Sequence, residues 1–266
     1  HTYIQEDLGD CSLLHALENE GTTESTFELF KQSLKALAHL QIQGDKKLDY
    51  TKCITSKVFG EQAILADLLY FKYYFLDTLK IPYDKEKLIE EFEALSNYLS
   101  HVDHMHFMYR DFQSRNIMVK EGNVYLIDYQ GGMKGALQYD VASLLWQAKA
   151  NLPEAWKHDL LQYYMDCVEV ELGKAINRTS FENQYTGYVL IRLLQVLGAY
   201  GFRGLFERKA HFLSSIPLAL NNLKWFLQRY QLGIGLPLFE SLLQQVVSKE
   251  VIHQFAIPKA DDPTKL

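Results

Sequence analysis

The chain has 266 residues, of which 48% are hydrophobic, 23% are charged and only six are proline, so it can bury a sizeable core, and its composition argues against fibrous and disordered proteins. The net charge of -6 provides no basic field that would attract nucleic acid or an anionic membrane surface. Cys11, Cys53 and Cys167 lie far apart without a Cys-x-x-Cys pair, which argues against a disulfide framework or a zinc site and favours the reducing cytosol.

The first part of the chain predicts a turn followed by helices. The first ten residues are acidic and poor in apolar side chains, so they do not resemble a signal peptide. A long helix is expected from about Ser25, a suitable N-cap, and a second over residues 61–79, before Pro82. Asp84 can cap a third helix. No apolar run approaches the roughly 18 residues that a membrane span needs, and we expect a cytoplasmic protein.

From Phe107 onward the pattern changes from helical to β. Residues 117–119 and 124–127 are apolar and flank Glu121-Gly122-Asn123, which predicts a β-hairpin with a glycine-containing turn. After Tyr139 the helical pattern returns for most of the remaining chain. The expected fold class is therefore α+β and mostly helical, with one small β-hairpin.

Three polar residues stand at the ends of this hairpin. Asp111 begins a polar loop, Asn116 follows five residues later, and Asp128 comes directly after the second strand. Phosphoryl transfer from ATP needs a carboxylate for the proton of the acceptor hydroxyl and oxygen ligands for Mg²⁺. We therefore predict Asp111 as the catalytic base and Asn116 and Asp128 as Mg²⁺ ligands. In the alternative interpretation all three are turn and cap residues.

The same residues resemble the catalytic and metal loops of the kinase superfamily. The resemblance lies in Arg110-Asp111-x-x-x-x-Asn116 followed by Ile127-Asp128-Tyr129. Tyr109 stands where the family usually has histidine, which leaves open how the catalytic loop is supported. Asp128-Tyr129-Gln130 replaces the usual Asp-Phe-Gly. Both departures keep the acid and metal positions intact.

The segment after Asp128 resembles one branch of that superfamily. Asp140 follows twelve positions later, which leaves no room for the long activation segment of a protein kinase. The spacing resembles the aminoglycoside phosphotransferase and choline kinase branch, whose fold is a protein-kinase-like C-lobe and whose acceptors are small molecules. Asp140 is expected to be structural, either as a helix N-cap or as a buried acceptor that ties its helix to the catalytic loop.

Within the branch, the strings around Asp111, Asp128 and Asp140 look most similar to the N-acetylmuramate/N-acetylglucosamine anomeric kinase family. The resemblance implies ATP- and Mg²⁺-dependent phosphorylation of a sugar hydroxyl, the anomeric one of an N-acetylhexosamine. An aminoglycoside or choline-type kinase remains an alternative, as does a kinase-like binding module without catalysis.

The resemblance also implies a nucleotide site. The hinge segment of Gln5, Glu6 and Asp7 would bind adenine, through main-chain groups of Gln5 and Asp7. Met118 and Ile127 would form an apolar floor below the adenine, although both can equally be plain core residues of the hairpin.

The expected parts of the chain follow from the same resemblance. Residues 1–10 would be the hinge and the end of an N-lobe, residues 11–257 a helical kinase-like C-lobe, and residues 258–266 a polar tail. The glycine-rich loop of a kinase N-lobe does not occur in the sequence, so we expect an N-lobe to precede His1.

Three further features each allow two interpretations. Arg115 would reach a phosphate or the acceptor and is counted with the catalytic residues, unless it only forms a surface ion pair. The glycine-rich residues 198–204 suggest a loop near a ligand or a helix connection. The cluster of His101, Asp103, His104 and His106 suggests a metal site or, more simply, a solvated connection.

The predicted partner is a small molecule and neither nucleic acid nor a membrane. Arg203, Arg208 and Lys209 lie in the helical part with few clustered acids, which favours a neutral or acidic acceptor such as an N-acetyl sugar over a polycationic one.

Overall fold

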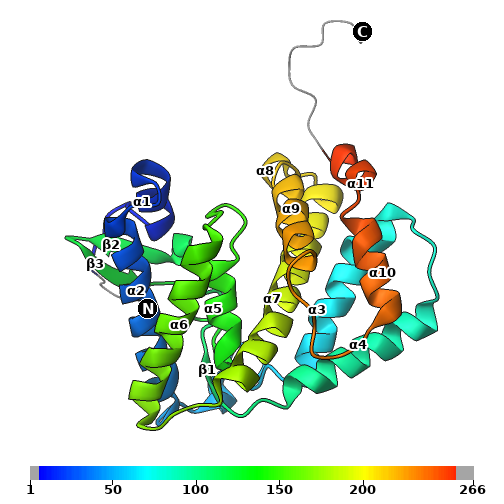
Figure 1. Ribbon diagram of the computed structural model, residues 1–266. Coiled ribbons are helices and arrows are strands. Elements are labelled where there is room, and N and C mark those ends of the chain that lie inside the picture. The colour runs from blue at the N-terminus through cyan, green and yellow to red at the C-terminus, as the bar shows by residue number, and fades with distance from the viewer. Residues whose placement is uncertain (1–5, 256–266) are drawn as a thin grey trace, which may run out of the picture. The chain divides into compact units, whose positions relative to one another are not determined.

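The computed structural model describes residues 6–255 and is mostly helical, with two short two-stranded sheets (Figure 1). The chain forms two compact units, each built from two separate segments. The first unit consists of His1–Gly60 and Val102–Val189, and the second of Glu61–His101 and Leu190–Leu266. Helix α7 (Arg178–Tyr200) begins in the first unit and ends in the second.

Among the described residues, the first unit holds all four strands, four complete α-helices and two 3₁₀ helices. In chain order they are α1 (Leu13–Glu20), α2 (Glu24–Asp45), η1 (Tyr50–Lys52), β1 (Met105–Met108), η3 (Ser114–Asn116), β2 (Ile117–Lys120), β3 (Asn123–Leu126), β4 (Met133–Ala136), α5 (Leu137–Leu145) and α6 (Glu154–Leu172). Helices α2 and α6 lie side by side (Figure 1). Leu34 and Leu37 of α2 and Leu160 of α6 are completely buried.

The N-cap of the long helix α2 lies two residues before the predicted cap, Ser25. Its N-cap is Thr23, whose side chain accepts a hydrogen bond from the Thr26 amide, and the Thr26 hydroxyl in turn accepts from the Thr23 amide. This reciprocal capping box satisfies two amides that would otherwise have no partner at the helix start. Ser25 was therefore wrong as the cap, since it lies within the first turn of α2.

The predicted hairpin is confirmed. Strands β2 and β3 are antiparallel, and Ile117 pairs with Leu126 and Lys120 with Asn123. The two turn residues, Glu121 and Gly122, have φ of 52° and 75°, which is the left-handed pair that a two-residue hairpin turn requires.

Strand β1 pairs with β4, a strand that the sequence patterns did not predict. The pairing is antiparallel, with Met108 opposite Met133. Strand β4 contains Gly135, where a Cβ would lie 2.6 Å from the Met108 sulfur, so the close approach of the two strands requires glycine. A glycine at such a position weakens the β pattern by which a strand is recognised.

Among its described residues, the second unit contains helices joined by loops and no named strand. It contains α3 (Glu61–Tyr74), η2 (Leu76–Leu79), α4 (Lys85–Ser100), the end of α7, η4 (Gly201–Phe206), α8 (Ala210–Leu213), α9 (Ile216–Leu227), α10 (Pro237–Val246) and α11 (Lys249–Gln254). Asp84 caps α4 as predicted, because its carboxylate accepts from the Lys87 amide. The helix expected over residues 61–79 ends at Tyr74 and continues as a 3₁₀ turn.

The glycine-rich residues 198–204 form neither a loop near a ligand nor a simple connection between helices. They continue α7 into the π-helical turn η4. A Cβ on Gly201 would lie 2.1 Å from the Tyr74 carbonyl oxygen, and one on Gly198 would lie 2.8 Å from the Tyr70 ring. These glycines therefore allow close packing against α3 within the second unit.

Residues Arg178–Phe206 form one helical stretch that is long and apolar enough to cross a bilayer, by length and composition alone. The sequence reading had found no such run. In the structure 56% of its most apolar window is buried inside the fold, which is also the behaviour of a core helix.

Candidate active site

Asp111, Asn116 and Asp128 meet at one end of the hairpin in the first unit. The Asn116 amide nitrogen lies 3.3 Å from Asp111 Oδ2 and 3.3 Å from Asp128 Oδ2. It also donates to the Asp111 carbonyl oxygen at 3.0 Å. One amide therefore joins the two carboxylates that sequence reasoning had paired with it, although they are 17 residues apart in the chain.

The hairpin ladder explains why Asp128 returns to Asn116. The Ile127 amide donates to the Asn116 carbonyl oxygen at 3.1 Å, which extends the β2–β3 ladder by one step. Asp128 then takes a left-handed conformation with φ of 72°, and its carboxylate also accepts from Gln130 at 2.6 Å. The left-handed residue turns the chain out of the ladder at this point.

A buried carboxylate holds the catalytic loop. Asp140 of α5 is completely buried and accepts from the Tyr109 amide at 2.7 Å and from the Arg110 amide at 2.9 Å. This confirms the buried-acceptor prediction; the N-cap alternative is wrong, because Ala136 caps α5. Burial raises the pKa of Asp140 to about 7, although the bonds from both amides act in the opposite direction.

Tyr109, which stands where the kinase superfamily usually has histidine, supports the catalytic loop. Its ring is buried, and its hydroxyl donates to the Ile127 carbonyl oxygen at 2.6 Å. Burial raises the pKa of this phenol, so the donor keeps its proton throughout the physiological range. A single side chain thus connects the loop of Asp111 with the residue before Asp128.

Arg110 and Arg115 point their guanidinium groups at different partners. The Arg110 group lies 4.4 Å from the Phe59 ring centroid and 4.9 Å from that of Tyr139, in the range of cation–π contacts. Arg115 is more exposed, and its guanidinium lies 3.6 Å from Asp111 Oδ2. The structure therefore shows an ion pair for Arg115, directly on the predicted catalytic carboxylate.

Met118 and Ile127 lie on one face of the hairpin. Because Met118 pairs with Tyr125, and side chains alternate along a strand, Met118, Tyr125 and Ile127 share that face. Tyr125 is 37% and Ile127 38% exposed. Met118 is half-buried, so neither Met118 nor Ile127 is a plain core residue. Tyr125 is a third member of this apolar face that was not predicted, although its spacing of two from Ile127 could have revealed it.

The predicted hinge lies beside the hairpin as far as the structure describes it. Gln5 falls outside the described residues. Lys120 of β2 donates to the Glu6 carboxylate at 2.7 Å and to the Asp7 carbonyl oxygen at 3.0 Å. The chain then continues along β2, where the Val119 amide donates to the Cys11 carbonyl oxygen at 2.8 Å.

The part of the chain that holds this site matches a known protein family. Residues 10–171 match the model of a family described as "Phosphotransferase enzyme family". The chain belongs to this family. The matched residues include the whole hairpin, the loop of Asp111 and helix α5.

The chain is also similar to individual proteins of known name. It is 27% identical over 147 residues to an N-acetylmuramate/N-acetylglucosamine kinase of Neisseria meningitidis serogroup B, over 54% of this chain and 43% of the relative. The chain therefore spans less than half the length of that curated relative. Among solved structures, the choline kinase of Cryptosporidium parvum Iowa II has a TM-score of 0.53 at 12% identity, covering 91% of this chain and 73% of its own.

A second solved structure is an amicoumacin kinase in complex with AMP-PNP, Ca²⁺ and Ami. It has a TM-score of 0.53 at 12% identity and covers 79% of this chain and 62% of its own. At such low identity these likenesses concern the fold. They confirm the predicted protein-kinase-like fold of the aminoglycoside phosphotransferase type.

The residues at the hairpin end fit the Mg²⁺ ion that the family implies. Mg²⁺ takes hard oxygen ligands, in most cases one or two carboxylates together with phosphates and water. Asp128 offers a carboxylate, and Asn116 offers its amide oxygen because its nitrogen is already bonded to the Asp111 carbonyl. Among residues 6–255 there is no cluster of three His, Cys, Asp or Glu side chains that could hold a metal, so the histidines near His104 form no such site.

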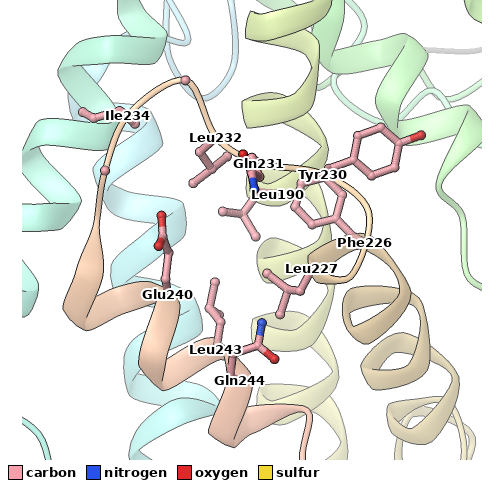
Figure 2. A pocket seen from close by; sticks show the side chains of 12 residues that line it. Leu190, Phe226, Leu227, Tyr230, Gln231, Leu232, Ile234, Glu240, Leu243 and Gln244 are labelled. Carbon is pink, nitrogen blue, oxygen red and sulfur yellow. The ribbon is translucent and has the colours of Figure 1, made fainter.

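Two features of the second unit bear on other sequence predictions. Arg203 and Lys209 each lie 2.9 Å from the Glu207 carboxylate, so these two cations are paired with an acid instead of forming an open basic patch. A pocket of about 610 Å³ lies between α7, α9 and α10 (Figure 2). Leucines and Phe226 form its walls, and the polar groups of Glu240 and Gln244 line it too. None of the predicted site residues contributes to this lining.

Proposed function

We propose that the protein is an ATP- and Mg²⁺-dependent phosphotransferase that acts on a hydroxyl group of a small molecule, and that this molecule is a sugar. The observation that carries the proposal is the meeting of Asp111 and Asp128 at the Asn116 amide. A base for a hydroxyl and a pair of oxygen ligands for a metal are the minimum that phosphoryl transfer needs from a protein.

In this proposal Asp111 acts on the acceptor. Its carboxylate accepts the hydroxyl proton as the oxygen–phosphorus bond forms and the bond from the γ-phosphorus to the bridging oxygen breaks. The Asp140 bonds to the Tyr109 and Arg110 amides hold the loop so that Asp111 keeps one position. Fixing a reacting group in this way removes part of the entropic barrier.

Asn116 and Asp128 would hold Mg²⁺, which supplies neutralisation of phosphate charge when bound. Tyr109 keeps Asp128 close to Asn116, because its hydroxyl donates to the carbonyl oxygen of the preceding residue, Ile127. Arg115 would leave the Asp111 carboxylate and turn to a phosphate or to the acceptor. Its exposed side chain and the long 3.6 Å contact are compatible with such an exchange.

For the nucleotide, we propose that adenine lies against the face of Met118, Tyr125 and Ile127. An aromatic ring and two apolar side chains, partly exposed on a rigid hairpin, offer a flat surface of the kind that a purine covers. The hinge main chain would contribute hydrogen bonds, with the Asp7 carbonyl currently engaged by Lys120. The AMP-PNP in the amicoumacin kinase supports a nucleoside triphosphate as the donor.

The sugar as acceptor is supported by the N-acetylmuramate/N-acetylglucosamine kinase relative. The choline kinase and the amicoumacin kinase support the alternative, in which the acceptor is an amine-bearing alcohol or an antibiotic. In line with the small-molecule role, we propose a cytoplasmic protein with residues 1–10 as the hinge of a two-lobed kinase.

The test uses the longest natural form of the protein that contains this chain. It is incubated with labelled ATP and Mg²⁺ and with N-acetylglucosamine, N-acetylmuramate, kanamycin, choline or no acceptor. We expect label on the two N-acetylhexosamines, with an alkali-stable but acid-labile phosphate if the anomeric hydroxyl is used. Label on kanamycin or choline alone would replace the sugar with the alternative.

A binding module without catalysis would behave differently. It would gain thermal stability from ATP together with Mg²⁺ and transfer phosphate to none of the acceptors. Asp111→Asn serves as the matched control, because it should strongly reduce transfer and keep this stabilisation.

A further inference from the structure

A chain of buried polar side chains lies behind the catalytic loop. Gln41 of α2, Tyr164 of α6 and Asp140 of α5 are each completely buried. The Gln41 amide nitrogen donates to Asp140 Oδ2 at 2.9 Å. The Tyr164 hydroxyl donates to the Gln41 amide oxygen and lies 3.1 Å from the Leu137 carbonyl oxygen. Three separate helices are thus joined by side chains that end on the loop.

The direction of these bonds is fixed by the donors available. Asp140 Oδ2 receives both the Tyr109 amide and the Gln41 amide, whereas Oδ1 receives the Arg110 amide. A carboxylate that accepts three N–H groups must be ionised to use all of its acceptor sites freely. The Tyr164 hydroxyl presents its proton to the amide oxygen of Gln41, so the amide nitrogen is the atom that faces Asp140.

We propose that Gln41 and Tyr164 are positioning residues that keep the Asp140 carboxylate ionised and oriented, and through it hold Arg110 and Asp111 in place. Arg110 has φ of 76°, a conformation that a residue with a side chain adopts only when its surroundings hold it. The catalytic consequence rests on the phosphotransfer function proposed above. The ordering of the loop does not.

A proton on Asp140 should loosen the loop. Protonation turns one carboxylate oxygen into an O–H donor, and this oxygen then has fewer lone pairs with which to accept an amide N–H. The Gln41 bond lowers the pKa of Asp140, against the larger effect of burial that brings it to about 7. Without that bond the carboxyl keeps its proton to a higher pH.

The other titrating groups around Asp140 are of different kinds. The Arg110 guanidinium favours the ionised carboxylate and stays charged. The phenols of Tyr109 and Tyr164 have pKa values raised by burial, and the thiol of Cys167, which interacts with Tyr164, has a raised pKa too. Asp140 is therefore the group of this set that changes charge near neutral pH.

The experiment follows hydrogen-exchange protection factors of the Tyr109 and Arg110 amides from pH 6 to 10, together with the carboxyl ¹³C shift of Asp140. In the wild type both should change with one midpoint. Gln41→Leu should shift that midpoint upward by about one pH unit, the size of one charge-assisted hydrogen bond. Tyr164→Phe should shift it in the same direction by less, because the amide of Gln41 loses the donor that orients it.

The matched control is Gln138→Leu. Gln138 is also buried in the first unit, and its amide nitrogen donates to Gln184 at 3.1 Å, whereas that of Gln41 donates to Asp140. It should lower stability and leave the midpoint where it is. If both Gln41→Leu and Tyr164→Phe leave the midpoint unchanged, or if Gln138→Leu moves it equally, the two side chains act only in packing and the proposal is overturned.

Activity provides a second and separate readout. At pH 7 we expect the kcat of Gln41→Leu to fall about fivefold, because a midpoint raised from about 7 by about one unit lowers the ionised fraction of Asp140 by that factor. The KM for the nucleotide should change little, and kcat should recover as the pH rises past the new midpoint. Should no acceptor be phosphorylated by the wild type, the proposed function fails, and the exchange midpoints still decide the positioning role.

Discussion

Two residues next to the candidate catalytic groups have left-handed backbone conformations although neither is glycine. Arg110 has φ of 76° and Asp128 has φ of 72°. Such conformations cost on the order of 1–3 kcal/mol and persist where the surroundings hold them. The Asp140 carboxylate holds the first, and the hairpin ladder with Tyr109 leads into the second. The spacing of the motif predicted Asp111, Asn116 and Asp128 as site residues. It could not predict the backbone angles of Arg110 and Asp128, because a sequence signals a left-handed angle reliably only at glycine.

Asp111→Asn should reduce turnover by about 10²- to 10⁴-fold, because the amide cannot accept the hydroxyl proton. Binding of Mg²⁺ and nucleotide should change little, since Asn116 and Asp128 keep their oxygens. Steady-state kinetics and titration calorimetry check the two parts. Asp159→Asn, the same change at an exposed site on α6, should leave both unaffected. Turnover near the wild-type value in Asp111→Asn would remove Asp111 as the base.

Tyr109→Phe should weaken the link between the two loops. The change removes only the hydroxyl and, with it, a part-buried hydrogen bond to the Ile127 carbonyl oxygen, a bond worth about 0.5–1.5 kcal/mol. We expect a lower unfolding free energy by roughly that amount and weaker Mg²⁺-dependent nucleotide binding. Chemical denaturation and calorimetry measure both. Tyr129→Phe is the control, because its ring is 65% exposed, and an equal loss there would contradict the assignment.

At the scale of the elements, the hairpin and the helix caps differ in how far they could be predicted. The hairpin was predictable, since Gly122 stands between two apolar strands of equal length. Strand β4 was not, because its identity depends on contact with β1, 25 or more residues earlier, and on a glycine that local patterns read as a break. The π-helical turn η4 was missed for the same reason: Gly201 is explained only by the Tyr74 carbonyl that it meets in space.

The same substitution should have opposite effects in two elements. Gly122→Ala places a side chain at φ of 75° in the hairpin turn and should lower the unfolding free energy by about 1 kcal/mol. Gly44→Ala lies inside α2, where the new Cβ would meet only the end of the Leu40 side chain at 3.5 Å, and should raise it by up to about 1 kcal/mol. Urea denaturation of both variants compares them directly. A rise in the unfolding free energy for both variants would show that the turn tolerates a side chain.

At the scale of the whole molecule, the two compact units are interleaved along the chain. Their boundaries fall after Gly60, His101 and Val189. The last boundary lies inside α7, so no change in composition or linker could mark it in the sequence. The predicted site residues all belong to the first unit, and this unit contains the buried Asp140 that connects its helices to the loop.

Asp140 also makes the stability of the fold depend on pH. Burial raises its pKa from 3.8 to about 7, so the folded protein binds this proton more tightly than the unfolded chain does. The stabilisation is therefore complete below about pH 4 and is lost as the pH rises through 7. A shift of this size corresponds to at most about 4 kcal/mol.

We expect the unfolding free energy of the wild type to fall between pH 4 and 7 relative to that of Asp140→Asn, which carries no titrating group at this position. Denaturation of both proteins over this range removes the contributions of all other titrating residues from the difference. Parallel curves would mean that Asp140 titrates at an ordinary pKa. A falling difference would mean that the ionised carboxylate, the form that accepts three donors and orders the loop, is the less stable one. The fold would then give up stability near neutral pH to hold Asp111 in place.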